Sequence, residues 1–327
     1  MKITFLGTGT STGVPQIGCS CKVCRSTDTR DKRLRTSVLV ETEQTRILLD
    51  CGPDFRQQIL PLDFRRIDAV LLTHEHYDHV GGIDDLRPFG VFGDVQLYAS
   101  ERTGGQLRQS LPYCFVEHKY PGVPQLRLHA VRPHEAFRVG ELQVTPVEVM
   151  HARLPILGYR VGRMAYITDM KTIADSELDY LQGLDLLVLN GLRHEPHYSH
   201  QTIEEACAFA RRLRVPRTYL IHMGHHIDLH AVEDARLPEG VRMAYDGLVV
   251  DVEGEGLATG FYKRMFKVCQ NGRLLLFLGS KKTGKRLFWR EKPLQNEFLY
   301  GFYAVFRHKF LRFSAPNEKS ISGERFF

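Results

Sequence analysis

Between residues 1 and 252, short apolar runs recur at close intervals, separated by glycine, proline and charged residues. Runs of this length are typical of β-strands, whereas apolar positions that repeat every three or four residues indicate a helix. We expect helices at 176–181 and 202–213, and a further helix that begins at 83. We expect strands at 2–6, 37–40, 45–49, 67–72, 95–99, 142–149, 159–161, 165–167, 184–189, 217–221, 241–245 and 248–252. The 327 residues therefore suit one large α/β domain, or one domain with an appendage.

Two stretches between these elements carry predictions of their own. Asp246-Gly247 is a favourable two-residue turn, so the last two strands are expected to form a hairpin that closes the domain. Residues 111–133 show no regular pattern, and we expect an irregular segment there. We expect surface or core roles, rather than catalytic ones, for the histidines in and beside it, His118, His129 and His134.

Candidate chemistry begins directly after the strand at 67–72, with the segment Thr73-His74-Glu75-His76-Tyr77-Asp78-His79. Three imidazoles and one carboxylate within six positions are ligands that metal ions prefer. His74 and His76 lie on one side of an extended strand end, and Asp78 and His79 follow as the backbone turns, so the loop can address two ions. A solvated polar loop is the alternative. Two adjacent metal ions suit a hydrolytic reaction.

This histidine-rich segment is the signature of the metallo-β-lactamase superfamily, which the sequence resembles. The resemblance implies an αββα sandwich with the metal ions at one edge. It also implies three further ligands, for which His151, Asp169 and His222 stand in the required places. In this superfamily Asp50, at the end of a predicted strand, would hold the metal-binding loop by hydrogen bonds. An ordinary turn or helix-capping role for Asp50 is the alternative.

A second candidate metal site is formed by three cysteines that lie close together in the sequence, Cys19, Cys21 and Cys24. Three thiolates are one ligand short of the tetrahedral set of a structural zinc ion. We expect His225 to supply the fourth ligand, because one loop would then carry ligands of both sites, and His226 is the competing residue. The odd total of seven cysteines favours thiolate metal binding in a reducing compartment over a disulfide framework. Three free thiols are the alternative.

The glycine-rich segment at 7–13, Gly-Thr-Gly-Thr-Ser-Thr-Gly, is similar in composition to a phosphate-binding loop. It lacks the Gly-Lys-Ser/Thr ending of such loops and the spacing of the dinucleotide fingerprint, so we give little weight to a phosphate-binding role. In the superfamily a loop of this kind lies beside the active site. Contact with a substrate therefore stays open for this segment.

The formal net charge of +6 belongs to the C-terminal part of the chain. Residues 253–327 carry 15 Lys and Arg against 6 Glu and no Asp, and they contain 11 of the 19 Phe and the only Trp. Residues 1–252 carry 29 basic against 32 acidic side chains, which argues against a nucleic-acid enzyme on bulk charge. We therefore predict a hydrolase domain at 1–252 and a basic, aromatic-rich extension at 253–327. Such a segment is typical of binding to nucleic acid, a membrane surface or a partner, and a loosely folded extension unrelated to catalysis is the alternative.

The sequence shows no apolar run near the roughly 18 residues of a membrane-spanning helix. Its first residues, 1–7, reach a glycine too soon for a secretory signal. We therefore expect a cytoplasmic protein without a membrane span.

Several features together resemble the phosphoribosyl 1,2-cyclic phosphate phosphodiesterase (PhnP-like) family over residues 1–252. They are the glycine-rich segment, the cysteine triplet, the histidine-rich segment, His200 before a helix, and the pair His222-x2-His225. The resemblance implies two catalytic Zn²⁺ or Mn²⁺ ions, a separate structural Zn²⁺ ion and often a homodimer. One catalytic ion would be bound by His74, His76 and His151 and the other by Asp78, His79 and His222, with Asp169 bridging both.

The resemblance also implies a reaction. A hydroxide between the two catalytic ions would attack a small cyclic phosphodiester, and His200 would protonate the leaving oxygen as general acid. The implied substrate is a phosphoribosyl 1,2-cyclic phosphate or a 2′,3′-cyclic nucleotide, and we expect no nucleic acid on the catalytic domain.

Three other functions compete with this one. The tRNA 3′-processing endonucleases share the histidine-rich segment but need a protruding RNA-binding arm, and no Gly/Pro-rich basic insertion lies between Asp169 and His222. The pyrroloquinoline-quinone biosynthesis B proteins share the glycine-rich segment and the cysteines but typically have an eroded catalytic set, whereas all seven ligands are present here. An adaptor driven by the extension would lose its salt-dependent binding on truncation at Val252.

Overall fold

The structure, a computed structural model, describes residues 1–119 and 122–252 together with four two-residue strands further on. The chain divides into two units, Met1–Gly256 and Leu257–Phe327. In the second unit two antiparallel ladders are described, β15 (Val268–Cys269) with β16 (Arg273–Leu274) and β17 (Leu278–Gly279) with β18 (Arg286–Leu287). The predictions for the role and order of residues 253–327 otherwise lie outside the described residues.

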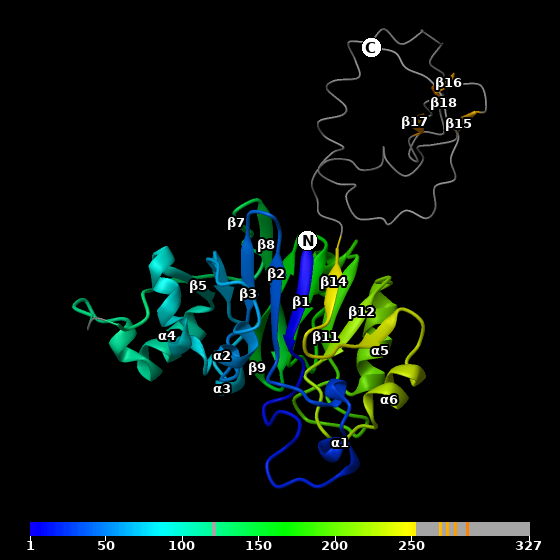
Figure 1. The fold of residues 1–327 in the computed structure, drawn as a ribbon, viewed down its shortest axis with the longest axis horizontal. Coiled ribbons are helices and arrows are strands. Elements are labelled where there is room, and N and C mark those ends of the chain that lie inside the picture. Colours follow the sequence, from blue (N-terminus) through cyan, green and yellow to red (C-terminus); the bar gives the residue numbers. More distant parts are fainter. Residues whose placement is uncertain (120–121, 253–267, 270–272, 275–277, 280–285, 288–327) are drawn as a thin grey trace, which may run out of the picture. The chain divides into compact units, whose positions relative to one another are not determined.

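Two seven-stranded sheets form the first unit (Figure 1). The first sheet has the order β14 (Val249–Asp251), β1 (Lys2–Gly7), β2 (Ser37–Glu41), β3 (Arg46–Leu49), β4 (Ala69–Leu71), β5 (Val95–Ala99) and β6 (Leu126–Ala130). The second has the order β13 (Val241–Met243), β12 (Thr218–Ile221), β11 (Leu186–Asn190), β10 (Met164–Ile167), β9 (Leu154–Val161), β8 (Leu142–His151) and β7 (Phe137–Val139).

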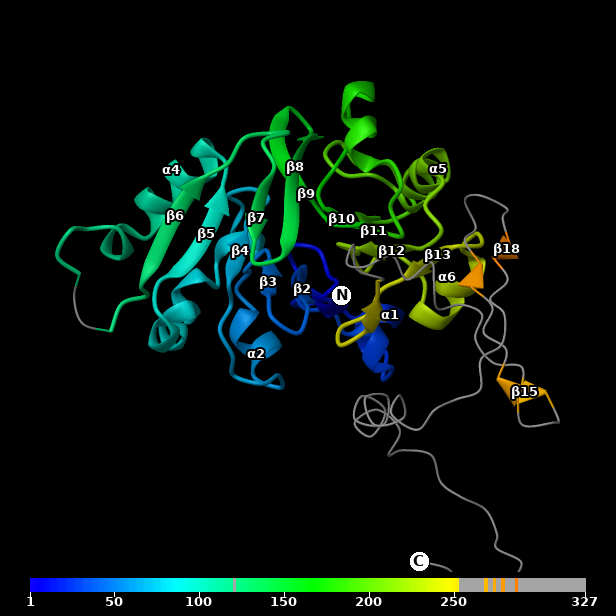
Figure 2. The same cartoon turned by 90° about the horizontal axis from the view of Figure 1, so that it is seen from above.

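Helices cover the outer faces of the two sheets (Figures 1 and 2). The first sheet contacts α2 (Phe55–Ile59), η2 (Ile83–Phe92) and α4 (Glu101–Ser110), and the second contacts η4 (Asp175–Leu181), α5 (Ile203–Leu213) and α6 (His230–Arg236). Loops contain α1 (Lys22–Arg25), η1 (Thr29–Asp31), α3 (Tyr77–Val80) and η3 (Pro112–Cys114). The expected αββα sandwich is confirmed. Within the described ranges, no helix has the length and apolar character that crossing a lipid bilayer requires.

Three apolar layers hold the sandwich together. The middle layer lies between the sheets and contains Val40, Leu71 and Tyr159. The second layer joins the second sheet to α5 through residues such as Phe209, and the third joins the first sheet to α2 through Phe55. Because the central strands are buried on both faces, their apolar runs are almost continuous, which is why the sequence pattern locates them.

The expected hairpin at Asp246-Gly247 is wrong. β13 pairs in parallel with β12 in the second sheet, whereas β14 pairs antiparallel with β1 in the first, so the turn crosses from one sheet to the other. The Asp246 carboxylate accepts hydrogen bonds from the Thr8 hydroxyl (2.8 Å) and the Leu34 amide (2.6 Å). These long-range bonds override the local preference of the turn for a hairpin.

The expectation of an irregular segment at 111–133 is also wrong in part. It contains β6, which pairs in parallel with β5. Only Leu126 is fully buried in this edge strand, so its sequence carries a weak apolar signal. His129 lies 2.8 Å from Gln96 Oε1, an arrangement that matches the structural role expected for it.

The loop between β11 and α5 is fixed by His194. Its Nδ1 contacts Glu204 of α5, and its Nε2 lies 2.9 Å from Glu233 Oε1 of α6. Burial acts to lower the pKa of His194, but the two carboxylates outweigh it and raise the pKa. An imidazole whose raised pKa favours the charged form therefore ties the loop to both helices.

Replacing His194 with asparagine should lower the melting temperature by about 1–3 °C at pH 6 and by less at pH 9, because a partly exposed ion pair is lost. The pKa is raised in the folded state, so the stabilisation is complete below the ordinary value of about 6.5 and disappears as the pH rises through the folded-state pKa. Thermal unfolding at both pH values measures this. The exposed His118→Asn is the control, and an equal loss at both pH values contradicts the assignment.

Candidate metal centre

Strand ends at one edge of the sandwich deliver the seven predicted ligands. The histidine-rich segment follows β4, His151 ends β8, Asp169 comes shortly after β10, and His222 follows β12 directly. Asp169 and His222 have φ values of +56° and +58°, and Asp50 at the end of β3 has +58°. Non-glycine residues rarely adopt this region, and such strain gathers at functional sites.

The first ligand cluster contains His74, His76, His151 and Asp169, whose ligand atoms lie within 4.8 Å of one another. His74 Nε2 is 2.9 Å from His76 Nδ1 and 3.8 Å from Asp169 Oδ2. His151 directs Nδ1 toward the backbone carbonyls of Asp169 (2.8 Å) and Ser199 (3.2 Å). These two carbonyls fix the ring and leave its Nε2 for the cluster.

The second ligand cluster contains Asp78, His79, Asp169 and His222, again within 4.8 Å. His222 Nε2 lies 3.1 Å from Asp169 Oδ1 and 3.4 Å from Asp78 Oδ2. His79 Nε2 lies 3.4 Å from Asp169 Oδ1 and 3.3 Å from Asp78 Oδ2. One oxygen of Asp169 therefore faces each cluster.

The chemistry of this donor set fits two cations. Asp78 and Asp169 are buried, and among the described residues their ion-pair partners are histidines, with no lysine or arginine. The buried His79 Nε2 has no hydrogen-bond partner. Buried carboxylates need a compensating charge, and imidazole nitrogens and carboxylate oxygens are the donors that Zn²⁺ and Mn²⁺ accept.

The pKa shifts of three ligands suit metal binding, whereas at His79 the carboxylate of Asp169 outweighs burial and raises the pKa well above its ordinary value. Burial acts to raise the pKa of Asp169, but His222 and His79 outweigh it and hold the pKa well below its ordinary value. Burial also acts to raise the pKa of Asp78, but His79 outweighs burial and lowers this pKa. Burial lowers the pKa of His74 well below its ordinary value. Ionised carboxylates and a neutral imidazole are the forms in which these side chains bind metals.

Asp50 holds the histidine-rich segment from behind, which favours the first of its two predicted roles. Its buried carboxylate accepts hydrogen bonds from the Thr73 amide (2.9 Å), His79 Nδ1 (2.8 Å) and the Tyr166 hydroxyl (2.9 Å). Donation from Nδ1 orients the His79 ring so that Nε2 faces the second cluster. Tyr166 carries no sequence signal for this role, because its only link to Asp50 is spatial.

His200 lies at the edge of both clusters. Its Nε2 is 3.1 Å from Asp169 Oδ2, and its ring stacks on His222 with centroids 4.9 Å apart. Among the described residues it belongs to neither ligand group. Burial lowers the pKa of His200 to about 4, so the ring is neutral near pH 7 in the free chain. His197 Nδ1 lies 3.0 Å from the Nδ1 of His200, on the side away from Asp169.

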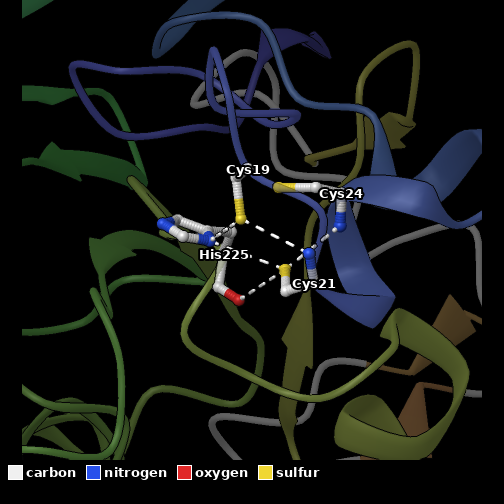
Figure 3. Close-up of side chains that lie close together, drawn as sticks. All are labelled: Cys19, Cys21, Cys24 and His225. Atoms are coloured by element: carbon white, nitrogen blue, oxygen red, sulfur yellow. Dashed lines mark hydrogen bonds between the residues drawn. The ribbon is translucent and has the colours of Figure 1, made fainter.

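The predicted thiolate site also comes together (Figure 3). The ligand atoms of Cys19, Cys21, Cys24 and His225 lie within 4.8 Å of one another. His225 Nδ1 is 3.2 Å from Cys19 Sγ and 3.6 Å from Cys21 Sγ. Burial acts to raise the pKa of the Cys21 thiol, but hydrogen bonds from the Cys24 amide and His225 lower it to about 6. Three sulfurs and one imidazole fit a tetrahedral Zn²⁺ ion, and the geometry favours His225 over His226.

The loop after β12 carries ligands of both sites and is tied to the glycine-rich segment. The Met223 amide donates to the Thr8 carbonyl, and the Thr10 amide donates to the Met223 carbonyl, each at 3.1 Å. On its other side the glycine-rich segment lies against Arg33. A Cβ at Gly9 would lie 2.9 Å from the Arg33 carbonyl oxygen, so only glycine allows the two backbones to lie this close. The glycine-rich segment therefore lies beside the catalytic ligands, as its resemblance implied.

Comparisons with known proteins agree with this geometry. Residues 45–223 match the family described as the beta-lactamase superfamily domain. An octanoyltransferase of Porphyromonas gingivalis is 48% identical over 259 residues, which cover 79% of this chain and 53% of that protein. A ribonuclease Z of Thermosynechococcus vestitus is 31% identical over 168 residues, which cover 49% of this chain and 36% of that protein. The chain thus spans about half or less of these two relatives.

Two solved structures resemble the chain. A crystal structure described as a new diphosphatase from the PhnP family has a TM-score of 0.72 and 40% identity, and the match covers 77% of this chain and 98% of that one. Zn²⁺-bound PqqB from Methylobacterium extorquens has a TM-score of 0.63 and 23% identity, covers 77% and 100%, and shows likeness of fold alone. The chain therefore belongs to the beta-lactamase superfamily of hydrolases and, within it, to the PhnP family.

Proposed function

We propose that the chain is a metal-dependent phosphoric diester hydrolase that cleaves a small cyclic phosphodiester. The observation that carries the proposal is the pair of ligand clusters that share Asp169, whose Oδ2 faces one cluster and whose Oδ1 faces the other. When bound as Zn²⁺ or Mn²⁺, two metal ions would lower the pKa of a water molecule and neutralise charge on the phosphoryl oxygens. We assign one ion to His74, His76, His151 and Asp169, and the other to Asp78, His79, His222 and Asp169.

The remaining task is proton transfer to the leaving group, which we assign to His200. An alkoxide leaves slowly unless it is protonated, so a proton donor beside the phosphoryl group is needed. His200 supports this role by position, since its Nε2 lies 3.1 Å from Asp169 while the ring stays outside both ligand clusters. Because the pKa of His200 is about 4 in the free chain, the role requires the negative phosphoryl group of a bound substrate to raise this pKa. His194 is held by Glu204 and Glu233 and is not available for the same task.

Hydrolysis of a diphosphate is the second candidate, because the PhnP-family structure at 40% identity is described as a diphosphatase. A phosphate leaving group needs little protonation, so a diphosphatase has less use for a donor at the position of His200. We therefore favour the diester. Assays of the purified chain with a 2′,3′-cyclic nucleotide and with a nucleoside diphosphate, each with Zn²⁺ and with Mn²⁺, separate the two.

An RNA-processing function has less support. Between Asp169 and His222 the chain forms β11 of the second sheet together with η4 and α5, which pack against that sheet, and the segment contains no Gly/Pro-rich basic insertion. The name octanoyltransferase belongs to a protein of which the chain spans 53%, and we propose no acyl transfer.

Replacing Asp169 with alanine should abolish diester hydrolysis while the chain stays folded, because the shared carboxylate serves both clusters. Turnover of 2′,3′-cyclic AMP and the circular dichroism spectrum measure the two effects. Asp185→Ala, which removes an aspartate that pairs with Arg163 and belongs to neither ligand cluster, is the matched control and should keep its activity. If the Asp169 variant retains turnover, the assignment of Asp169 as a ligand shared by both clusters is contradicted.

Replacing His200 with alanine should cut turnover of diesters with an alkyl leaving group by roughly 10²- to 10⁴-fold, a typical general-acid contribution. A p-nitrophenyl diester should lose far less, because its leaving oxygen needs little protonation. Metal content, measured by elemental analysis, should stay unchanged, and His118→Ala is the control. An equal loss on both substrates, or loss of metal, refutes the role and moves it to His197.

A further inference from the structure

Two tyrosines beside the candidate ligands expose their rings. Tyr77 stands between His76 and Asp78 and is 71% exposed, and Tyr198 stands two residues before His200 and is 79% exposed. They are the most exposed aromatic side chains within the described ranges. Single exposed apolar residues are ordinary, but two large rings on the loops that build one site indicate a binding surface.

A row of ring contacts runs from Tyr198 across the metal centre to His76, the residue before Tyr77. Successive centroids lie 4.9, 5.0, 4.7 and 5.1 Å apart along the series Tyr198, His197, His200, His151 and His76. Tyr77 is the next residue after His76. Tyr198 therefore stands at one end of a row that includes the proposed acid and the ligands His151 and His76, and Tyr77 follows the last residue of this row in sequence.

Both rings are supported from behind while much of each remains open. A Cβ at Gly81 would lie 2.7 Å from Tyr77 Cε2, so the ring packs directly on glycine backbone. The Tyr198 ring packs against the His197 ring, with an angle of 39° between the two ring planes. Within the described part of the chain, neither phenol hydroxyl has a hydrogen-bond partner. The aromatic ring, rather than the hydroxyl, is therefore the part of each side chain that we expect a ligand to contact.

We infer that Tyr77 and Tyr198 form a stacking site for a nucleobase, so that the substrate is a nucleotide diester rather than a base-free sugar phosphate. The inference rests on the proposed function, because it places the scissile phosphate at the metal centre, beside the two loops that carry these rings. Among groups attached to phosphodiesters, the nucleobase is the planar aromatic one that such rings bind. Stacking on an aromatic side chain is worth roughly 10- to 100-fold in affinity and tolerates any base, since every base has a π-face.

The first test compares AMP with ribose 5-phosphate, which share the sugar and phosphate and differ in the base. Calorimetric titration of the metal-loaded full chain should show AMP binding about tenfold or more tightly. The Y77A/Y198A double variant should lose this advantage, and the Y77F/Y198F double variant should keep it because stacking does not use the hydroxyl. Tyr113→Ala is the matched control, because this exposed tyrosine lies on η3 and its hydroxyl donates to Asp84.

The second test separates this inference from the proposed function. 2′,3′-Cyclic AMP and the 2,3-cyclic phosphate of methyl riboside carry the same reacting group, and the base should lower KM for the first by a similar factor. If the chain prefers AMP through the two tyrosines but cleaves neither diester, the base site stands and the proposed function fails. If AMP and ribose 5-phosphate bind equally well, the inference is overturned whether or not the diesters are cleaved.

A role in self-association is the remaining outcome, and it also overturns the inference. In that case the Y77A/Y198A variant keeps the AMP advantage and changes its mass by light scattering. Under the inference, the mass of the variant equals that of the wild type.

Discussion

The candidate metal centre depends on one buried carboxylate, Asp169, which is 2% exposed and faces a ligand cluster with each oxygen. Burying a carboxylate without an opposite charge costs several kcal/mol, and the described chain pairs it only with histidines. Metal cations satisfy that requirement. Asp169 and His222 both have positive φ values at the strand ends where their side chains converge, and such strained backbones gather at functional sites.

Parts of the chain that are distant in sequence hold this arrangement in place. Met223, next to the ligand His222, exchanges hydrogen bonds with the glycine-rich segment near the N-terminus. The thiolate group then joins Cys19 to His225 across 206 residues of sequence. A structural ion at that point would fix the loop that presents His222 and would link the two sites mechanically, although their ligand sets are separate.

The histidine-rich segment can be predicted from sequence because its ligand residues cluster after the apolar strand β4, and the family resemblance then identifies His151, Asp169 and His222 at or near other strand ends. Roles that depend on distant partners cannot be predicted in this way. Asp50 stays ambiguous in the sequence because the donor Tyr166 lies 116 residues away. The turn at Asp246 misleads because its decisive partner, Thr8, is 238 residues away. The helix α4 gives little signal because Gly104 and Gly105 lower its intrinsic propensity.

Metal content tests the central claim most directly. Elemental analysis of the full chain, purified without chelator or added metal, should find about three metal ions per chain, two at the clusters that share Asp169 and one at the thiolate group. The thiols of Cys19, Cys21 and Cys24 should resist titration until a chelator is added. A content near one ion per chain, with all thiols freely titratable, would contradict both the binuclear centre and the structural zinc site.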